Sequence, residues 1–170
     1  MTEANDSVRG HAMRRIDAAE YQLRLLVETM VAAGRDEEEI VSVVRAADDR
    51  PRVLIAEDET LVRMDIGTTL EAAGFLVCAE AGDGREAVAL ALEHEPDAII
   101  MDANMPQLDG VAAAAAILAS RPVPIVMLTG YDYGELIDRA FAAGISHYLV
   151  KPFAEQEIVA ALRAAVEDGV

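Results

Sequence analysis

The sequence predicts an α/β protein built on a doubly wound, five-stranded parallel sheet and preceded by a helical hairpin. From residue 52 onward, short apolar or β-branched runs alternate with helical stretches, which is the pattern of βα units. Those runs are almost continuously apolar, as expected of strands that helices cover on both faces. Residues 1–50, in contrast, show only helical spacing. A chain of 170 residues has room for one domain of ~100–150 residues and a small appendage.

The hairpin begins with a helix whose apolar residues recur at alternating three- and four-residue spacing over about two and a half heptads. These residues are Ile16, Ala19, Leu23, Leu26, Met30 and Ala33. A turn follows at Gly34 and Arg35, and Asp36 with Glu39 forms a capping box for a second helix. The second helix has its apolar face at Ile40, Val43, Val44 and Ala47. Because an exposed apolar face needs burial, we expect residues 1–50 to have a regulatory or oligomerisation role.

Five strands follow the polar linker 48–51. The predicted ranges are Arg52–Glu57, Phe75–Glu80, Asp97–Asp102, Pro124–Thr129 and His147–Val150. Only the second strand, which contains Cys78 and Ala79, looks like an edge strand. Cys78 is the only cysteine, and we expect it to be a small buried apolar residue.

The helices between these strands are delimited by local signals. Gly74 and Gly144 can take the left-handed conformation that closes a helix, and Asp83 with Glu86 forms a second capping box. A closing helix is expected near Ala154–Val166. Its predicted sheet-facing stripe consists of Ile158, Val159, Leu162 and Val166.

Composition excludes several classes of protein. A net charge of −17, with the 14 basic residues dispersed, disfavours direct binding to nucleic acid. The polar start has no signal-peptide pattern, and the longest apolar stretch, Val111–Ala119, is far shorter than the roughly 20 residues that cross a bilayer. We therefore expect a cytoplasmic protein without a membrane segment.

Polar residues stand at the ends of four predicted strands. Glu57 and Asp58 follow the first strand, Asp102 ends the third, Thr129 ends the fourth and Lys151 follows the fifth. The carboxyl ends of parallel strands meet at one edge of a sheet, where three carboxylates need a compensating cation. Oxygen ligands of this kind suit Mg²⁺. With a lysine ammonium and a threonine hydroxyl added, the set predicts phosphoryl transfer.

Four segments carry a resemblance to a known family. VLIAEDE, IIMDANMPQLDG, IVMLTG and YLVKPF resemble the signature segments of response-regulator receivers, and the similarity covers residues 52–166. It implies a receiver domain at residues 51–170, with a flavodoxin-like sheet of strand order 2-1-3-4-5. It also implies a sensor histidine kinase or phosphotransfer protein as phosphodonor, and a cis peptide bond before Pro152. Such a protein is not an enzyme, although it catalyses its own phosphorylation and dephosphorylation.

The resemblance also assigns roles to single residues. Asp102 is the implied phosphoacceptor, and Thr129 and Lys151 are the implied phosphoryl contacts. Tyr148 matches the aromatic switch residue that acts with Thr129. The implied Mg²⁺ ligands are Asp58, Asp102 and the backbone carbonyl of Asn104, with Glu57 acting through bound water.

Several alternatives remain open at this point. The segments AEDETLVRMD and EAGDGREAV resemble antiterminator (ANTAR) regulators, but the chain ends at Val170, so we expect no RNA-binding domain after the receiver. A haloacid-dehalogenase-like phosphatase needs a carboxylate where Asn104 stands, and a flavodoxin-like cofactor binder needs a phosphate loop where AEDET stands. We expect an output partner protein and a homodimer through residues 11–47.

Overall fold

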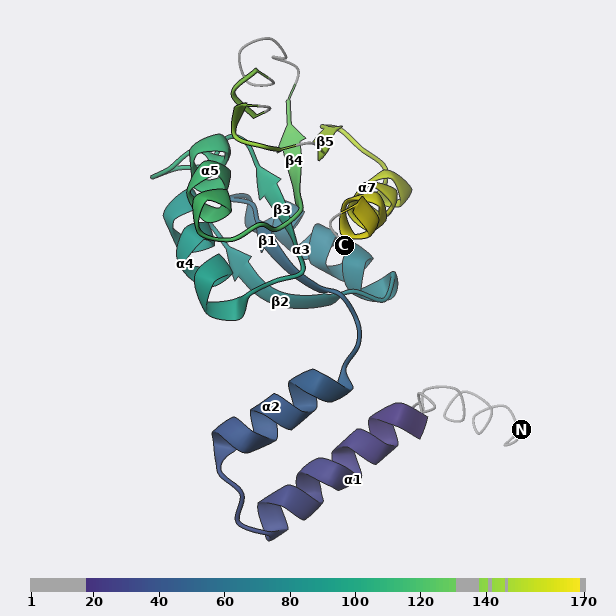
Figure 1. The fold of residues 1–170 in the computed structure, drawn as a ribbon. Coiled ribbons are helices and arrows are strands. Elements are labelled where there is room, and N and C mark those ends of the chain that lie inside the picture. Colours follow the sequence, from purple (N-terminus) through teal and green to yellow (C-terminus); the bar gives the residue numbers. More distant parts are fainter. Residues whose placement is uncertain (1–17, 131–137, 141, 146, 169–170) are drawn as a thin grey trace, which may run out of the picture. The chain divides into compact units, whose positions relative to one another are not determined.

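The structure is a computed structural model that describes residues 18–130, 138–140, 142–145 and 147–168 (Figure 1). It divides into two compact units, Met1–Asp49 and Arg50–Val170. Within the described ranges, no helix is long and apolar enough to cross a membrane. Ile16 of the predicted heptad stripe lies outside the described residues.

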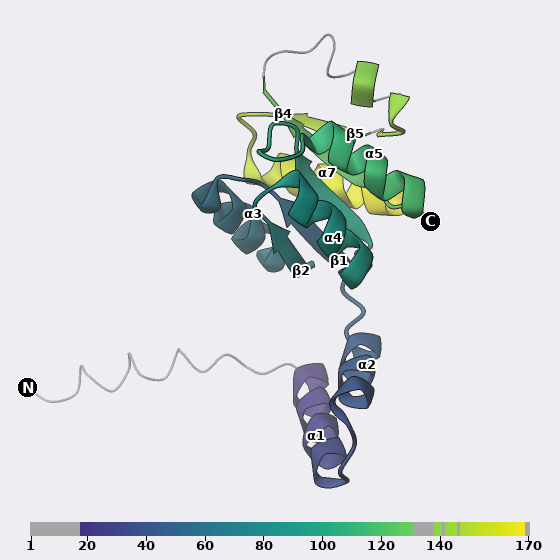
Figure 2. The same ribbon diagram turned by 90° about the vertical axis from the view of Figure 1, so that its left-hand side faces the viewer.

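From residue 18 onward, the N-terminal unit contains two helices, α1 (Ala18–Ala32) and α2 (Glu37–Ala47), which lie side by side as an antiparallel hairpin (Figures 1 and 2). Asp36 caps α2 by accepting a hydrogen bond of 2.9 Å from the Glu39 backbone N–H. In the predicted capping box, the Glu39 carboxylate would also accept a hydrogen bond from the Asp36 backbone N–H. It binds Arg35 at 3.1 Å instead.

The apolar stripe of α1 differs in part from the predicted one. Leu23 and Met30 are half-buried as expected, but Leu26 and Ala33 are exposed. Val27 is the third half-buried residue, because a straight helix advances 100° per residue and drifts away from a strict heptad.

The C-terminal unit is a five-stranded parallel sheet of order β2-β1-β3-β4-β5. Its strands are β1 (Arg52–Ala56), β2 (Leu76–Ala81), β3 (Ala98–Asp102), β4 (Ile125–Thr129) and β5 (His147–Val150). Each prediction lies within one residue of the observed strand, and the doubly wound architecture and its strand order are confirmed.

Two expectations about the edges of the sheet were wrong. β5 is also an edge strand, because it pairs only with β4, and two of its four residues, His147 and Tyr148, are large and polar-tipped, so they tolerate partial exposure. Cys78 is half-buried and not fully buried. Its strand bulges there, since Val53 pairs with Val77 and Leu54 pairs with Ala79, which leaves Cys78 as the extra residue.

In the described part of this unit, four long helices cover the two faces of the sheet. They are α3 (Thr60–Ala72), α4 (Gly84–His94), α5 (Gly110–Ser120) and α7 (Glu155–Asp168). Helices α4 and α5 pack on one face, whereas α3 and α7 pack on the other (Figures 1 and 2). In α7, Ile158 and Leu162 are buried and Val159 and Val166 pack at the margin of the core, which confirms the predicted stripe.

The helix ends show how the sequence sets the boundaries. Gly74 and Gly144 have φ angles of +90° and +88°, so both act as the predicted left-handed helix stops. Asp83 caps α4 through the backbone N–H groups of Arg85 and Glu86. The Glu86 carboxylate accepts from the Gly82 backbone N–H at 2.7 Å. In a capping box it would accept from the backbone N–H of Asp83, the next residue. The Lys151–Pro152 peptide bond is cis, as predicted.

Candidate acidic site at the strand ends

Three carboxylates meet where β1 and β3 end. Glu57 follows β1 and is 1% exposed, and Asp102 is the last residue of β3 and is 5% exposed. Asp58 is exposed to solvent. One carboxylate oxygen of each residue lies within 4.8 Å of one oxygen of each of the others. The sheet topology therefore brings these predicted residues together.

Lys151 joins two of these carboxylates. Its Nζ lies 2.7 Å from Glu57 Oε2 and 2.8 Å from Asp102 Oδ1. Its backbone N–H donates to the Thr129 carbonyl at 2.8 Å, which aligns the end of β5 with the end of β4. The side chain and the backbone of Lys151 thus both fix its position at the site.

The remaining oxygens of the two buried carboxylates accept backbone hydrogen bonds. Glu57 Oε1 accepts from the Glu59 N–H, and Asp102 Oδ2 accepts from the Asn104 N–H, each at 3.2 Å. Each carboxylate is consequently held on one side by Lys151 and on the other by its own loop. This double anchoring fixes the orientation of both carboxylates.

Burial and charge determine the electrostatics of the site. Burial raises the pKa of Glu57, and the charge of Asp102 raises it further, against the hydrogen bond from Lys151. Burial alone would lower the pKa of Lys151, but its hydrogen bonds and charge interactions with Asp102 and Glu57 outweigh burial and raise it. Lys151 is therefore a cation that faces more negative charge than it can neutralise.

A divalent cation fits this arrangement. Glu57, Asp58 and Asp102 offer only oxygen ligands, the type that Mg²⁺ prefers. Asp58 is exposed, so one side of the cluster is open to a hydrated ion. Asn104, where the phosphatase alternative needs a carboxylate, is an exposed amide on the adjoining loop.

Thr129 and Tyr148, the two residues that we predicted to form a switch, lie on neighbouring strands. Thr129 is 3% exposed, and its hydroxyl donates to the Gly130 carbonyl at 3.2 Å. Tyr148 is 50% exposed on β5, where it is paired with Met127 of β4. Among the described contacts, neither side chain is bonded to the carboxylate cluster.

Two glycines that we did not single out from the sequence control the loop after β3. A Cβ atom on Gly110 would lie 2.0 Å from the Asp102 carbonyl oxygen, and one on Gly84 would lie 2.0 Å from the Leu108 carbonyl oxygen. Both glycines begin helices directly after a capping aspartate. An Asp-Gly pair in front of a helical stretch is the signal that could have identified them.

Arg63 is a further residue that the sequence did not indicate. Its Nη1 donates to the main-chain carbonyl of Glu57 and its Nε binds the Glu80 carboxylate at 3.2 Å. Its side chain is 16% exposed. Arg63 therefore ties the loop that carries Glu57 and Asp58 to the edge strand β2.

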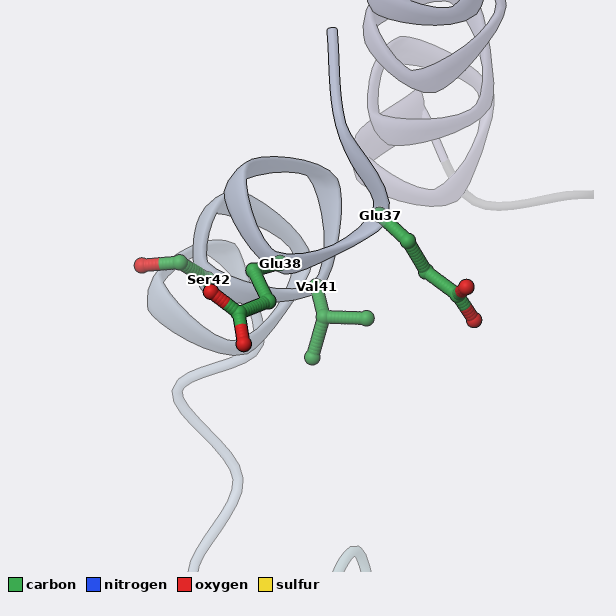
Figure 3. A pocket seen from close by; sticks show the side chains of 4 residues that line it. All are labelled: Glu37, Glu38, Val41 and Ser42. Atoms are coloured by element: carbon green, nitrogen blue, oxygen red, sulfur yellow. The ribbon is translucent and has the colours of Figure 1, made fainter.

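A separate hollow of about 540 Å³ lies on α2. Figure 3 shows its lining side chains, Glu37, Glu38, Val41 and Ser42. The two glutamates point in different directions in this view, and none of the four residues belongs to the strand-end cluster. This hollow contributes no chemistry to the site.

Comparison with known proteins identifies the C-terminal unit. The model of the response regulator receiver domain matches residues 53–163. The transcriptional regulatory protein PdtaR of Mycobacterium tuberculosis is 50% identical over 115 residues, which cover 68% of this chain and 56% of PdtaR. The uncharacterized transcriptional regulatory protein YxjL of Bacillus subtilis is 39% identical over 119 residues, which cover 69% of this chain and 55% of YxjL. The chain thus spans about half the length of these curated relatives.

Solved structures agree with this match. The signal receiver domain of a modulated diguanylate cyclase from Desulfovibrio desulfuricans has a TM-score of 0.67 at 32% identity, with 71% of this chain and 97% of that chain covered. The chemotaxis protein CheY4 of Vibrio cholerae has a TM-score of 0.64 at 34% identity, with 68% and 98% covered. Over residues 53–163, this chain belongs to the response-regulator receiver family of two-component systems.

Proposed function

We propose that Asp102 receives a phosphoryl group from a sensor histidine kinase or a phosphotransfer protein. The position of its carboxylate carries this proposal. Asp102 is 5% exposed at the end of β3, 2.8 Å from the Lys151 ammonium and beside Glu57 and Asp58. A carboxylate next to one fixed cation and a cluster of cation ligands is suited to attack a phosphoryl group.

The proposed transfer is a single displacement at phosphorus, in which atoms and charge balance. An Asp102 carboxylate oxygen attacks the phosphorus of a phosphohistidine, so that a P–O bond forms as the P–N bond breaks. The electron pair of the broken bond stays on the imidazole nitrogen, which takes up a proton. Water later attacks the same phosphorus, and phosphate leaves while Asp102 regains its carboxylate. The receiver is not a classical enzyme, because it would catalyse these steps only on itself.

The neighbouring residues would stabilise the charge that develops in both steps. Mg²⁺ held by Asp58, Asp102, the Asn104 carbonyl and, through water, Glu57 would neutralise phosphoryl oxygens. Lys151 stays tied to Glu57 by its 2.7 Å contact, so its ammonium remains beside the site when Asp102 is modified. Such preorganised charge is the main source of catalysis in phosphoryl transfer.

We also propose that Thr129 and Tyr148 transmit phosphorylation to an output partner protein. The Thr129 hydroxyl would exchange its bond to Gly130 for a phosphoryl oxygen, and the half-exposed Tyr148 ring would turn toward the vacated space. Residues 51–170 would form the receiver domain. Residues 1–50 would have a regulatory or oligomerisation role, with a homodimer through residues 11–47.

Substitution of the phosphoacceptor tests this function. The Asp102→Asn protein should take up no label from a cognate histidine kinase or from acetyl phosphate in the presence of Mg²⁺. Asp65→Asn is the matched control, because Asp65 is an exposed aspartate of α3 and should be labelled like the unmutated chain. Normal labelling of Asp102→Asn would show that another residue is the phosphoacceptor.

A further inference from the structure

We propose that Arg63 is a positioning residue of the acidic site. It holds the main-chain carbonyl of Glu57 and thereby directs the carboxylate of Asp58, the next residue, toward the cluster. Arg63 acts through the main chain and not as a ligand of a cation. The inference rests on the proposed function, because that function assigns Mg²⁺ to the cluster, and it adds a residue that sets the affinity for the ion.

The Asp58 carboxylate needs support from its backbone. Glu57 and Asp102 are each bonded to Lys151 and to a backbone N–H. Asp58 is exposed, and among the described contacts no hydrogen bond or ion pair holds its carboxylate. One of its oxygens still lies within 4.8 Å of an oxygen of each of the other two carboxylates. The loop from which Asp58 projects must therefore set this direction.

Arg63 fixes the peptide group that precedes the Asp58 side chain. Its Nη1 donates to the main-chain carbonyl of Glu57. Because a peptide group is planar, the position of this carbonyl fixes the plane that contains the Asp58 Cα atom. The Glu57 N–H donates to the Ala81 carbonyl at 3.1 Å. Both polar backbone groups of Glu57 are thus held, the carbonyl by α3 and the N–H by β2.

Arg63 is itself anchored by its backbone and by its side chain. Its N–H donates to the Glu59 carbonyl at 2.9 Å in the first turn of α3, and its Nε donates to Glu80 Oε2 at 3.2 Å. The guanidinium is a rigid plane, so the bond to Glu80 determines where Nη1 points. The charge of Glu80 also offsets that of Arg63, which reduces repulsion of a cation in the site.

The contacts of Arg63 serve position more than stability. Its ion-pair partner Glu80 has a side chain that is 47% exposed, and pairs with an exposed partner contribute little to folding. Residue type carries no information here, because every basic residue except Lys151 is arginine. The bonded group does, since the carbonyl belongs to the residue directly before a candidate ligand. Loss of such an outer partner typically weakens metal binding by roughly 10–100-fold.

Binding of Mn²⁺ to the full-length, unphosphorylated chain tests this role. Mn²⁺ takes the same oxygen ligands as Mg²⁺, and the electron paramagnetic resonance signal of free Mn²⁺ gives the dissociation constant without any reaction. Arg63→Met should raise this dissociation constant about tenfold. Loss of a positive charge near the site would by itself lower it, so a positioning role and a charge effect predict opposite signs.

Arg121→Met is the matched control. Arg121 is half-buried, and its Nη1 donates to the main-chain carbonyl of Pro96 at 3.0 Å. Pro96 precedes β3, so this bond lies at the opposite end of the strands. The control loses the same charge and the same kind of bond, and its dissociation constant for Mn²⁺ should stay within about twofold of the unmutated value.

Arg63→Lys is a second variant that keeps the charge but not the rigid pair of donors. It should weaken Mn²⁺ binding by at least about twofold, and it takes the place of Arg63→Met if urea denaturation shows that the methionine variant is not folded. Unchanged binding by a folded Arg63→Lys protein would then overturn the positioning role.

A double-mutant cycle shows whether Arg63 acts through Asp58. In an Asp58→Asn background, Arg63→Met should change the dissociation constant by less than about twofold, because the ligand that Arg63 positions is already lost. If the effects of the two substitutions simply multiplied, Arg63 would not act through Asp58 and the inference would be wrong.

Failure of this role and failure of the proposed function give different results. If folded Arg63→Met binds Mn²⁺ as tightly as the unmutated chain, or if Arg121→Met weakens binding equally, the positioning role is overturned and the cation site stands. If the unmutated chain binds no Mn²⁺, the cation site fails and the positioning role fails with it. Normal labelling of Asp102→Asn would overturn only the assignment of the phosphoacceptor.

Discussion

Lys151 compensates part of the negative charge of the two buried carboxylates. It is the only lysine among the 14 basic residues, and its ammonium reaches two carboxylates at 2.7 and 2.8 Å. A compact ammonium can donate to both oxygens from one point, whereas a guanidinium is a wider planar group that needs a bidentate partner. Composition alone would place arginine here, so the exception indicates a local requirement.

We expect Lys151→Arg to keep the charge but to lose function. Phosphorylation from acetyl phosphate in the presence of Mg²⁺ should slow at least tenfold, which corresponds to ~1.4 kcal/mol of transition-state stabilisation. Arg85→Lys, on the exposed surface of α4, is the control for an exchange between arginine and lysine outside the site, and it should not change the rate. In the unmutated chain, an amine-reactive probe should modify Lys151, and Mg²⁺ with beryllofluoride should protect it. Equal labelling in both states would contradict this role.

Glu57 illustrates a conflict between stability and function at one residue. Burial raises its pKa above the ordinary 4.5, so the ionised carboxylate destabilises the folded state. A group with a raised carboxyl pKa binds its proton more tightly when folded, and it therefore costs stability as the pH rises through that range. The negative charge of Glu57 that destabilises the fold is also the charge that would attract Mg²⁺ to the site.

We therefore expect Glu57→Gln to be at least as stable as the unmutated chain at neutral pH without Mg²⁺. Thermal melts from pH 4.5 to 8 should show that its relative stability declines as the pH falls through the raised pKa of Glu57. Its stabilisation by added Mg²⁺ should be smaller than that of the unmutated chain. A Glu57→Gln protein that loses stability most at high pH would show that the ionised carboxylate is favourable.

At the scale of elements, the sequence predicted the features that leave a local or periodic signal. The order of strands and helices and the buried stripe of α7 were evident from hydrophobic spacing, and the left-handed stops at Gly74 and Gly144 were evident from residue type. The loop after β3 was less evident, because close backbone approach at Gly110 leaves no periodic signal. The stripe of α1 was assigned from heptad spacing, which cannot show whether α2 covers Leu26 or Val27. The close approach at Gly110 and the choice between Leu26 and Val27 both depend on tertiary contacts, which the spacing of residues does not reveal.

Gly110 should tolerate no side chain. A Cβ atom would lie 2.0 Å from the Asp102 carbonyl oxygen, so Gly110→Ala must displace either α5 or the end of β3. We expect a loss of ~1–3 kcal/mol in the free energy of unfolding, measured by urea denaturation, together with slower phosphorylation of Asp102.

Gly67 offers the matched control on another helix. Its nearest neighbour for a Cβ atom is Ile55 Cδ1 at 3.8 Å, an ordinary van der Waals distance. Gly67→Ala should therefore stabilise α3 by ~0.5–1 kcal/mol through helix propensity. If both alanine variants behaved alike, close approach at Gly110 would not be the cause.

At the scale of the whole molecule, the chemistry and the hairpin occupy separate units. Every residue of the acidic site lies in Arg50–Val170, and the two apolar clusters that support it are formed by the sheet, α3, α4, α5 and α7. The family match also begins at residue 53. The fold of the site therefore has its own core, and its reactivity should not require residues 1–50.

Removal of residues 1–50 tests this independence. The shortened chain should be phosphorylated by acetyl phosphate and Mg²⁺ at a rate within about twofold of the complete chain, because its carboxylates, Lys151 and core are retained. Its mass in solution or its capture of a partner should change, because the apolar faces of α1 and α2 are gone. A shortened chain with the same oligomeric state and the same partners would show that the hairpin has another role. A folded but unreactive one would show that the hairpin contributes to the site itself.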